Sequence, residues 1–286
     1  MAEQATPDES IMSIALYRYM CLNIVGSEEH VKTIRMVHTV RDNLPGNDDK
    51  GRITSGSFGE GLEMRGSDID LMKKIPFTEV CETINIPCNP DKTYFTMETD
   101  DTDPGFTLLR LIHIDEFNPL VFCVQIGGKY YLSNIYIKQI FLNKSSSPII
   151  HGPCISDEDG VYDTAPYLHC KSWITQAQPW ITRSNNGWPG HNVKQSIIKQ
   201  GVLFVAKGIQ GSTKEEFEWR ISFSVGEKRL IYTFTHTQLL CYALLKILLK
   251  DVISIDLDCK ELLCSYFMKT ILFWISGIST FNMETR

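Results

Sequence analysis

The stretch "GSFGEGLEMRGSDIDLM" at residues 56–72 restricts the fold most, because it sets two acids one residue apart at the start of an apolar run. In a β-strand, residues i and i+2 point to the same face. Asp68 and Asp70 would therefore project together, while Ile69 and Leu71 face a core. Two like charges held this close favour a bound cation. We therefore expect a sheet with a carboxylate pair on one face.

The same letters also suit a solvated loop that leads into a strand, since Asp and Ser are frequent in turns. Gly56 and Ser57 favour a site. Gly56 can adopt a positive φ, and the Ser57 hydroxyl with nearby backbone N–H groups can line an anion-binding turn. A phosphate-binding turn and a carboxylate pair are the two halves of a metal–nucleotide site, because Mg²⁺ prefers one or two carboxylates together with phosphate oxygens.

Composition limits the other possibilities. The chain has 286 residues, of which 43% are hydrophobic, enough for a large core and two lobes. Its formal net charge of -6 gives no global basic signal, so a nucleic acid would need a local basic patch. The acidic N-terminus lacks a secretory pattern and lysines interrupt the late apolar segments, so we expect a cytoplasmic chain without a membrane partner. The pairs Cys81/Cys88 and Cys259/Cys264 lack C-x-x-C spacing, so zinc is not expected.

The order of periodic segments predicts helices, then a mixed sheet, then helices. Residues 9–43 have helical spacing with a break near 26–29. Strands are predicted at 67–77, 119–141 and from Val161, and in "GVLFVAKGI" and "EWRISFS"; the tail of 119–141 also suits a helix. After Thr235 the period returns to 3.6. We expect a bilobed α/β (α+β) architecture with a cleft between sheet and helices.

Four segments, in order, resemble the male abnormal 21-like nucleotidyltransferase family, whose members include cGAS and the cGAS-like receptors of invertebrates. They are the Gly56-Ser57 turn with the two acids, "EWRISFSVGEKRLI" at 218–231, "QLLCYALLKILLK" at 238–250 and "CSYFMKTILFW" at 264–274. The resemblance implies a bilobed nucleotidyltransferase fold. Spine helices would occupy residues 1–48, a mixed-sheet catalytic core 49–234, and a helical (HhH/H2TH-like) lobe 235–286. It also implies further helices after the last residue, so we expect a truncated lobe.

The resemblance further implies that Asp68, Asp70 and a third carboxylate on a neighbouring strand are catalytic and bind Mg²⁺ or Mn²⁺. Asp163 is the best match for the third, although Asp157 and Asp159 stand nearby. Pro166 fits only an edge or a bulge, which weakens the assignment of that strand.

Other positions carry over as nucleotide-binding residues. Arg220, Ser222 and Ser224 would share one strand face, Lys246 would meet the triphosphate, and Tyr266 would stack on a base. Ordinary alternatives exist: strand polarity, a solvated lysine and a core tyrosine. The full implied set is Gly56, Ser57, Arg220, Ser222, Ser224, Lys246, Ser265 and Tyr266.

The implied function is Mg²⁺-dependent joining of ATP or GTP into a cyclic dinucleotide or short oligonucleotide, switched on by double-stranded RNA in innate immunity. The zinc insertion of vertebrate cGAS is missing, since His236 leads directly into the helix with only Cys241 nearby. Two alternatives stay open: an inactive member that binds nucleic acid or protein, and a constitutive transferase with a protein or small-molecule acceptor. Double-stranded RNA would need a local basic face, for which the candidates are Lys194, Lys199, Lys207 and Arg183. The alternative is that these charged residues belong to an ordinary solvated surface.

Overall fold

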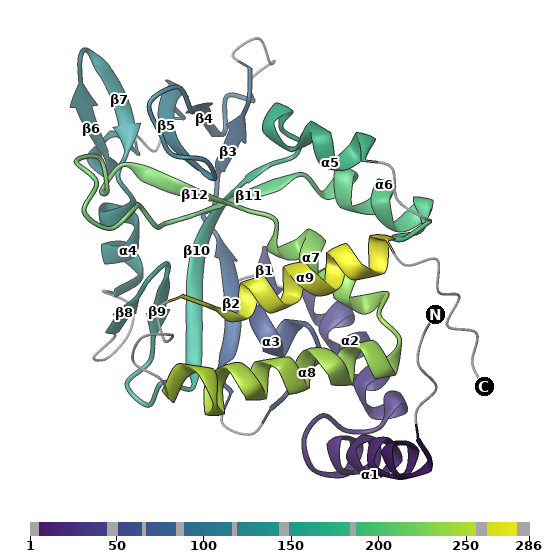
Figure 1. Cartoon of the computed structure of the whole chain (residues 1–286). Coiled ribbons are helices and arrows are strands. Elements are labelled where there is room, and N and C mark those ends of the chain that lie inside the picture. Colours follow the sequence, from purple (N-terminus) through teal and green to yellow (C-terminus); the bar gives the residue numbers. More distant parts are fainter. Residues whose placement is uncertain are drawn as a thin grey trace.

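The computed structural model describes residues 6–44, 51–64, 67–83, 89–115, 119–142, 149–183, 187–255 and 262–278. Cys88, Cys259 and residues 279–286 at the end of the predicted C-terminal lobe lie outside these ranges. Helices surround a mixed sheet, as the sequence predicts, and α8 and α9 cross in front of it (Figure 1). In the described ranges, no helix has both the length and the hydrophobicity that crossing a bilayer requires.

The helices begin where side chains can satisfy free backbone N–H groups. Thr6 and Glu9 form a capping box at the start of α1, and Ser27 accepts from the His30 N–H at the start of α2. The predicted break near 26–29 is therefore confirmed. The helices are α1 (Pro7–Asn23), α2 (Glu28–Asn43), α3 (Gly56–Gly59), α4 (Asn134–Leu142), α5 (Gln178–Thr182), α6 (His191–Gln200), α7 (Ser224–Tyr232), α8 (His236–Asp251) and α9 (Ser265–Ile278).

The main path of the sheet has the order β1-β2-β10-β11-β12-β5-β4-β3. β2 pairs with β10 and β3 with β4 in parallel, and the other pairs are antiparallel. The β6–β7 hairpin joins β5, and β8–β9 joins β10. The strands are β1 (Arg52–Thr54), β2 (Ile69–Lys74), β3 (Thr78–Cys81), β4 (Thr93–Glu98), β5 (Phe106–His113), β6 (Cys123–Ile126), β7 (Lys129–Leu132), β8 (Ile149–His151), β9 (Cys154–Ser156), β10 (Tyr162–Cys170), β11 (Val202–Val205) and β12 (Glu218–Ser222).

Pro166 lies in a central strand, so the expectation of an edge or bulge is wrong. The carbonyls of Val161 and Tyr167 accept from β2-side N–H groups, so odd-numbered residues of β10 bond toward β2. Pro166 therefore points the other way. On that side β9 pairs with residues 163–164 and β11 with residues 167–170, which leaves position 166 between the two partners. The missing N–H of proline thus removes no ladder bond.

The N-terminal helices share a core with the C-terminal ones. Met20 of α1, Val31 of α2, Ile231 of α7 and Met268 of α9 are buried together with several residues of α8. A separate core lies on the sheet, around Phe95, Phe204 and Trp219 among others. The predicted spine and helical lobe therefore form one packed unit, although they are at opposite ends of the chain.

A buried ion pair fastens α2 to the strand that leads into the acidic region. Lys228 Nζ of α7 lies 2.7 Å from Asp42 Oδ2 and donates to Thr54 Oγ1 at 2.6 Å. The Lys228 and Asp42 side chains are only 9% and 17% exposed. Asp42 also accepts from the Thr54 N–H at 2.9 Å, so helix, strand and cation meet at one point.

We expect Lys228→Met to lower the free energy of unfolding by about 3 to 5 kcal/mol, because it leaves the Asp42 carboxylate buried without its cation. The measurement is urea denaturation at pH 7. Arg229→Met is the matched control, since Arg229 is the neighbouring residue and, within the described ranges, its side chain makes a long hydrogen bond of 3.4 Å with Gln200. Equal losses in the two variants would contradict the role of the pair.

Candidate active site

The pairing of β1 with β2 places the Gly56-Ser57 turn next to Asp70. The Ser55 N–H donates to the Asp70 carbonyl at 2.9 Å, and α3 follows at once as a single turn. Gly56 has φ +56°, and a Cβ at this position would lie 1.9 Å from Asp70 Oδ2. Only glycine fits here, because it tolerates a positive φ and leaves room for the carboxylate.

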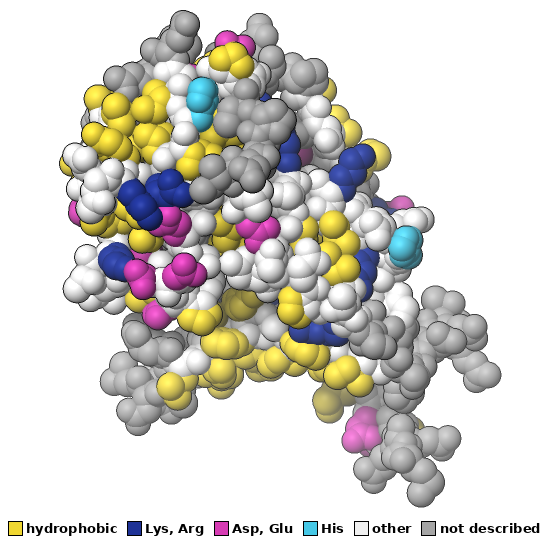
Figure 2. Space-filling model, turned by 90° about the horizontal axis from the view of Figure 1, so that it is seen from above, with side chains coloured by type: hydrophobic (Ala, Val, Ile, Leu, Met, Phe, Trp, Pro, Cys, Tyr) yellow, Lys and Arg dark blue, Asp and Glu magenta, His cyan; other side chains and the backbone are white. Residues whose placement is uncertain are grey.

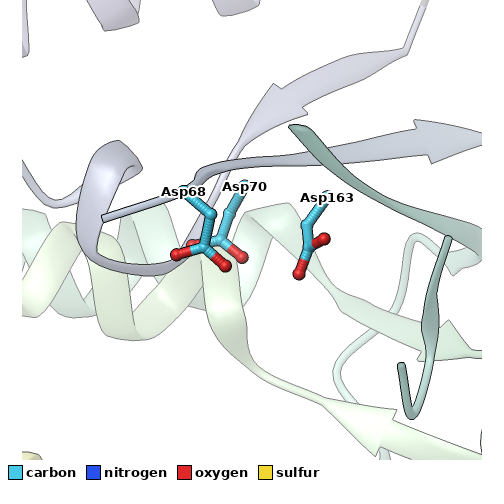
Figure 3. A group of neighbouring side chains, drawn as sticks. All are labelled: Asp68, Asp70 and Asp163. Atoms are coloured by element: carbon cyan, nitrogen blue, oxygen red, sulfur yellow. The ribbon is translucent and has the colours of Figure 1, made fainter. Parts of the chain in front are cut away.

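The parallel register of β2 and β10 brings the three acids together. Asp70 is paired with Asp163, and Asp68 stands just before β2, two residues from Asp70. Carboxylate oxygens of the three residues lie within 4.8 Å of one another. Figure 3 shows the three side chains extending into the same space. Asp157 instead accepts from the N–H groups of Val161 and Tyr162, at 2.7 and 3.0 Å, and caps its turn. The structure thus groups the three predicted ligands, whose catalytic role stays a prediction.

The three carboxylates repel one another at a partly buried position. Burial raises the pKa of Asp70 to about 7, with further increases from Asp68 and Asp163, while Lys246 acts in the opposite direction. Ser156 Oγ donates to Asp163 Oδ1 at 2.5 Å and fixes that carboxylate. Three converging carboxylates, one of them hard to ionise, fit a hard divalent cation such as Mg²⁺ or Mn²⁺, which would remove the repulsion.

A lysine from the helical side reaches the Gly-Ser turn. Lys246 Nζ of α8 donates a hydrogen bond to Ser57 Oγ, so these two predicted nucleotide-binding residues touch. Burial lowers the pKa of Lys246, while Glu60, Asp70 and Asp68 favour its charged form. The alternative of a solvated lysine is therefore wrong.

Behind this turn lies a cluster that the sequence analysis missed. Lys269 Nζ of α9 lies 2.5 Å from Glu60 Oε1 and 3.1 Å from Glu227 Oε2, and the Glu60 side chain is 4% exposed. The two carboxylates raise the pKa of Lys269 despite its burial. Glu60 stands inside the quoted acidic stretch, but nothing in the sequence links it to a lysine on α9.

The remaining predicted nucleotide-binding residues are more dispersed. Arg220 is exposed on β12, and its charge acts on the thiol of Cys154 beside the acids. Ser222 ends β12 and donates to Ser224 at 3.2 Å, but Ser224 already begins α7, so its predicted place on the strand face is wrong. Ser265 and Tyr266 begin α9 and are exposed, Tyr266 at 55%, so the alternative of a core tyrosine is also wrong.

The predicted basic face is divided. Lys194 of α6 lies over the Trp180 ring of α5, and Arg183 lies over Trp274 of α9. Lys207 follows the far end of β11, where its ammonium lies near Gly152 and Lys138. The grouping of Lys207 with the lysines of α6 is therefore wrong. On the side of the molecule that Figure 2 shows, Lys and Arg side chains are spread in small groups rather than in one continuous patch.

We expect Asp70→Asn to stabilise the chain in EDTA at high pH. The Asp70 carboxyl titrates near pH 7 when folded and near 3.8 when unfolded, so its charge destabilises the fold as pH rises between these values. The free energy of unfolding should rise by up to about 4 kcal/mol above pH 7, and the gain should vanish near pH 4. Thermal denaturation at both pH values tests this, with the exposed Asp159→Asn as control. A gain that is independent of pH would contradict it.

The sequence comparison agrees with this geometry. Residues 154–233 match the family model described as the Mab-21 protein nucleotidyltransferase domain. The matched segment runs from β9 through α7 and contains Asp163 and Arg220. Together with the mixed sheet around it, the match supports membership of the chain in the Mab-21-like nucleotidyltransferase family.

Proposed function

We propose that the chain is a metal-dependent nucleotidyltransferase that joins nucleoside triphosphates, ATP or GTP, into a cyclic dinucleotide or a short oligonucleotide. One observation carries the proposal: the carboxylates of Asp68, Asp70 and Asp163 converge beside a Gly-Ser turn that a lysine reaches from the helical side. The family match supports the reaction type.

In this proposal the three carboxylates hold Mg²⁺ or Mn²⁺, which when bound would lower the pKa of the acceptor hydroxyl and neutralise the triphosphate. Asp163, oriented by Ser156, also takes the proton of the acceptor hydroxyl. Ser57 and Lys246 give up their mutual hydrogen bond and bind phosphate oxygens. These roles are sufficient because phosphoryl transfer depends mainly on positioning and charge neutralisation.

The finer parts of the proposal rest on the resemblance to cGAS-like receptors. They are the cyclic product, activation by double-stranded RNA, a role in innate immunity and a cytoplasmic location. Since Lys207 lies apart from α6, an RNA surface would have to depend on Lys194 and Lys199 of that helix. A salt-sensitive, sequence-independent affinity for duplex RNA would support such a surface.

We expect the Asp68→Asn, Asp70→Asn double variant and Asp163→Ala each to lower nucleotide transfer by more than about 100-fold, since they remove groups needed chiefly in the transition state. Purified chain is incubated with mixed triphosphates and Mg²⁺ or Mn²⁺, with and without long duplex RNA, and the products are resolved by mass. Asp157→Ala is the control and should keep most activity, because Asp157 caps a turn. Wild-type chain that binds triphosphate but makes no product would favour the inactive-module alternative.

We expect Gly56→Ala to abolish transfer because the added methyl would displace the Asp70 carboxylate. Gly127→Ala is a matched control: Gly127 has the same φ of +56°, but an added Cβ meets nothing within 4 Å. Both variants carry the backbone strain and only one disturbs the site, so transfer should fall more than about 100-fold in the first alone. Similar activities in the two variants would show that the turn does not need its close approach to Asp70.

A further inference from the structure

Helix α1 is apolar on two opposite sides, and one side is left open. On its inner side, Met20 is buried in the core shared with α8, and Cys21 Sγ lies 3.4 Å from His236 Nε2. Every other residue of α1 except Cys21 is exposed. Apolar sides of a helix are normally covered, and no described residue of the chain covers the outer side of α1.

The open side is a regular stripe. At 100° per residue, its apolar members fall within an arc of about 100°, centred roughly opposite the inner side. Leu22 is 83% exposed and Met12 71%. These side chains expose on the order of 600 Å² in all, at the upper end of the largest patch on a typical monomer and near the ~800 Å² per partner of a standard interface. The stripe consists of Ile11, Met12, Ala15, Tyr19 and Leu22.

We propose that a second copy of this chain covers the stripe, through antiparallel pairing of the two α1 helices about a two-fold axis near Ala15. A two-fold interface must be complementary to itself. The small Ala15 side chain at the crossing allows close approach, and Ile11 of one copy then faces Tyr19 of the other. The larger side chains of each copy then fill the space beside Ala15 of the other copy.

The charged residues Asp8 and Arg18 are also arranged in a way that suits the two-fold pair. Asp8 lies within the stripe arc at one end of α1, and Arg18 borders it toward the other end. In the antiparallel pair, Asp8 of each copy comes within about one helical turn of Arg18 of the other, a distance that the arginine side chain spans. A parallel pair would set like charges side by side, so the arrangement of Asp8 and Arg18 selects the antiparallel one.

Sedimentation equilibrium of the full chain tests this at concentrations between about 1 and about 100 µM. An interface of this area is expected to have a Kd on the order of micromolar, which lies within that range. We expect a reversible monomer–dimer equilibrium. Leu22→Glu should raise the Kd by more than about tenfold, because it removes an apolar contact and places a carboxylate opposite Asp8 of the other copy. Val121→Glu is the control, since Val121 is 70% exposed outside α1, and it should leave the Kd unchanged.

Exchange of charges tests the geometry. Asp8→Arg alone and Arg18→Asp alone each place like charges together in a dimer, so each should weaken it by about tenfold. An equimolar mixture should restore dimerisation, because both contacts across a mixed pair are then of opposite charge. Circular dichroism checks that α1 stays folded in every variant. A chain that is monomeric at 100 µM, a dimer indifferent to Leu22→Glu, or a mixture that stays monomeric would each overturn the proposal.

Discussion

The parallel pairing of β2 with β10 is the contact on which the acidic region depends. It sets Asp70 directly beside Asp163, and the i, i+2 spacing adds Asp68 on the same face. Without a bound cation, the repulsion between the three carboxylates destabilises the fold. Burial and this repulsion together raise the pKa of Asp70. The fold withstands the repulsion because the strands are held by ladders on both sides and by a large buried core.

The helices bring the opposite charge to the same place. Lys246 of α8 reaches the Gly-Ser turn, and Lys269 of α9 neutralises Glu60 just behind it. On the other side, Lys228 joins α2 to the end of β1. Three lysines from three different helices thus contact the segment from Thr54 to Glu60. The position of the turn is therefore set by long-range charge pairing as well as by its own backbone.

Much of this was accessible from local patterns. The shared face of Asp68 and Asp70, the positive φ of Gly56 and the helix break near residues 26–29 depend on neighbours in the chain, and the sequence analysis predicted them. Asp163 was the best match for the third acid that the family resemblance implied, and the structure groups it with the other acids. The strand position predicted for Ser224 is wrong because the same residues fit either a strand that continues two residues past Ser222 or a helix that begins at Ser224.

The sequence by itself determined which segments alternate, which are helical and where two acids share a face, because these depend on periodicity over a few residues. It could not determine which strands are neighbours in the sheet, or which element supplies the partner of a charged residue far away in the chain. Only the tertiary structure decided that Pro166 lies between the segments of β10 that pair with β9 and with β11. It also decided that Lys207 lies apart from the lysines of α6 and that Glu60 forms an ion pair with Lys269. The physical reason is that strand order and helix packing join residues far apart in the chain, and local propensity carries no information about such pairs.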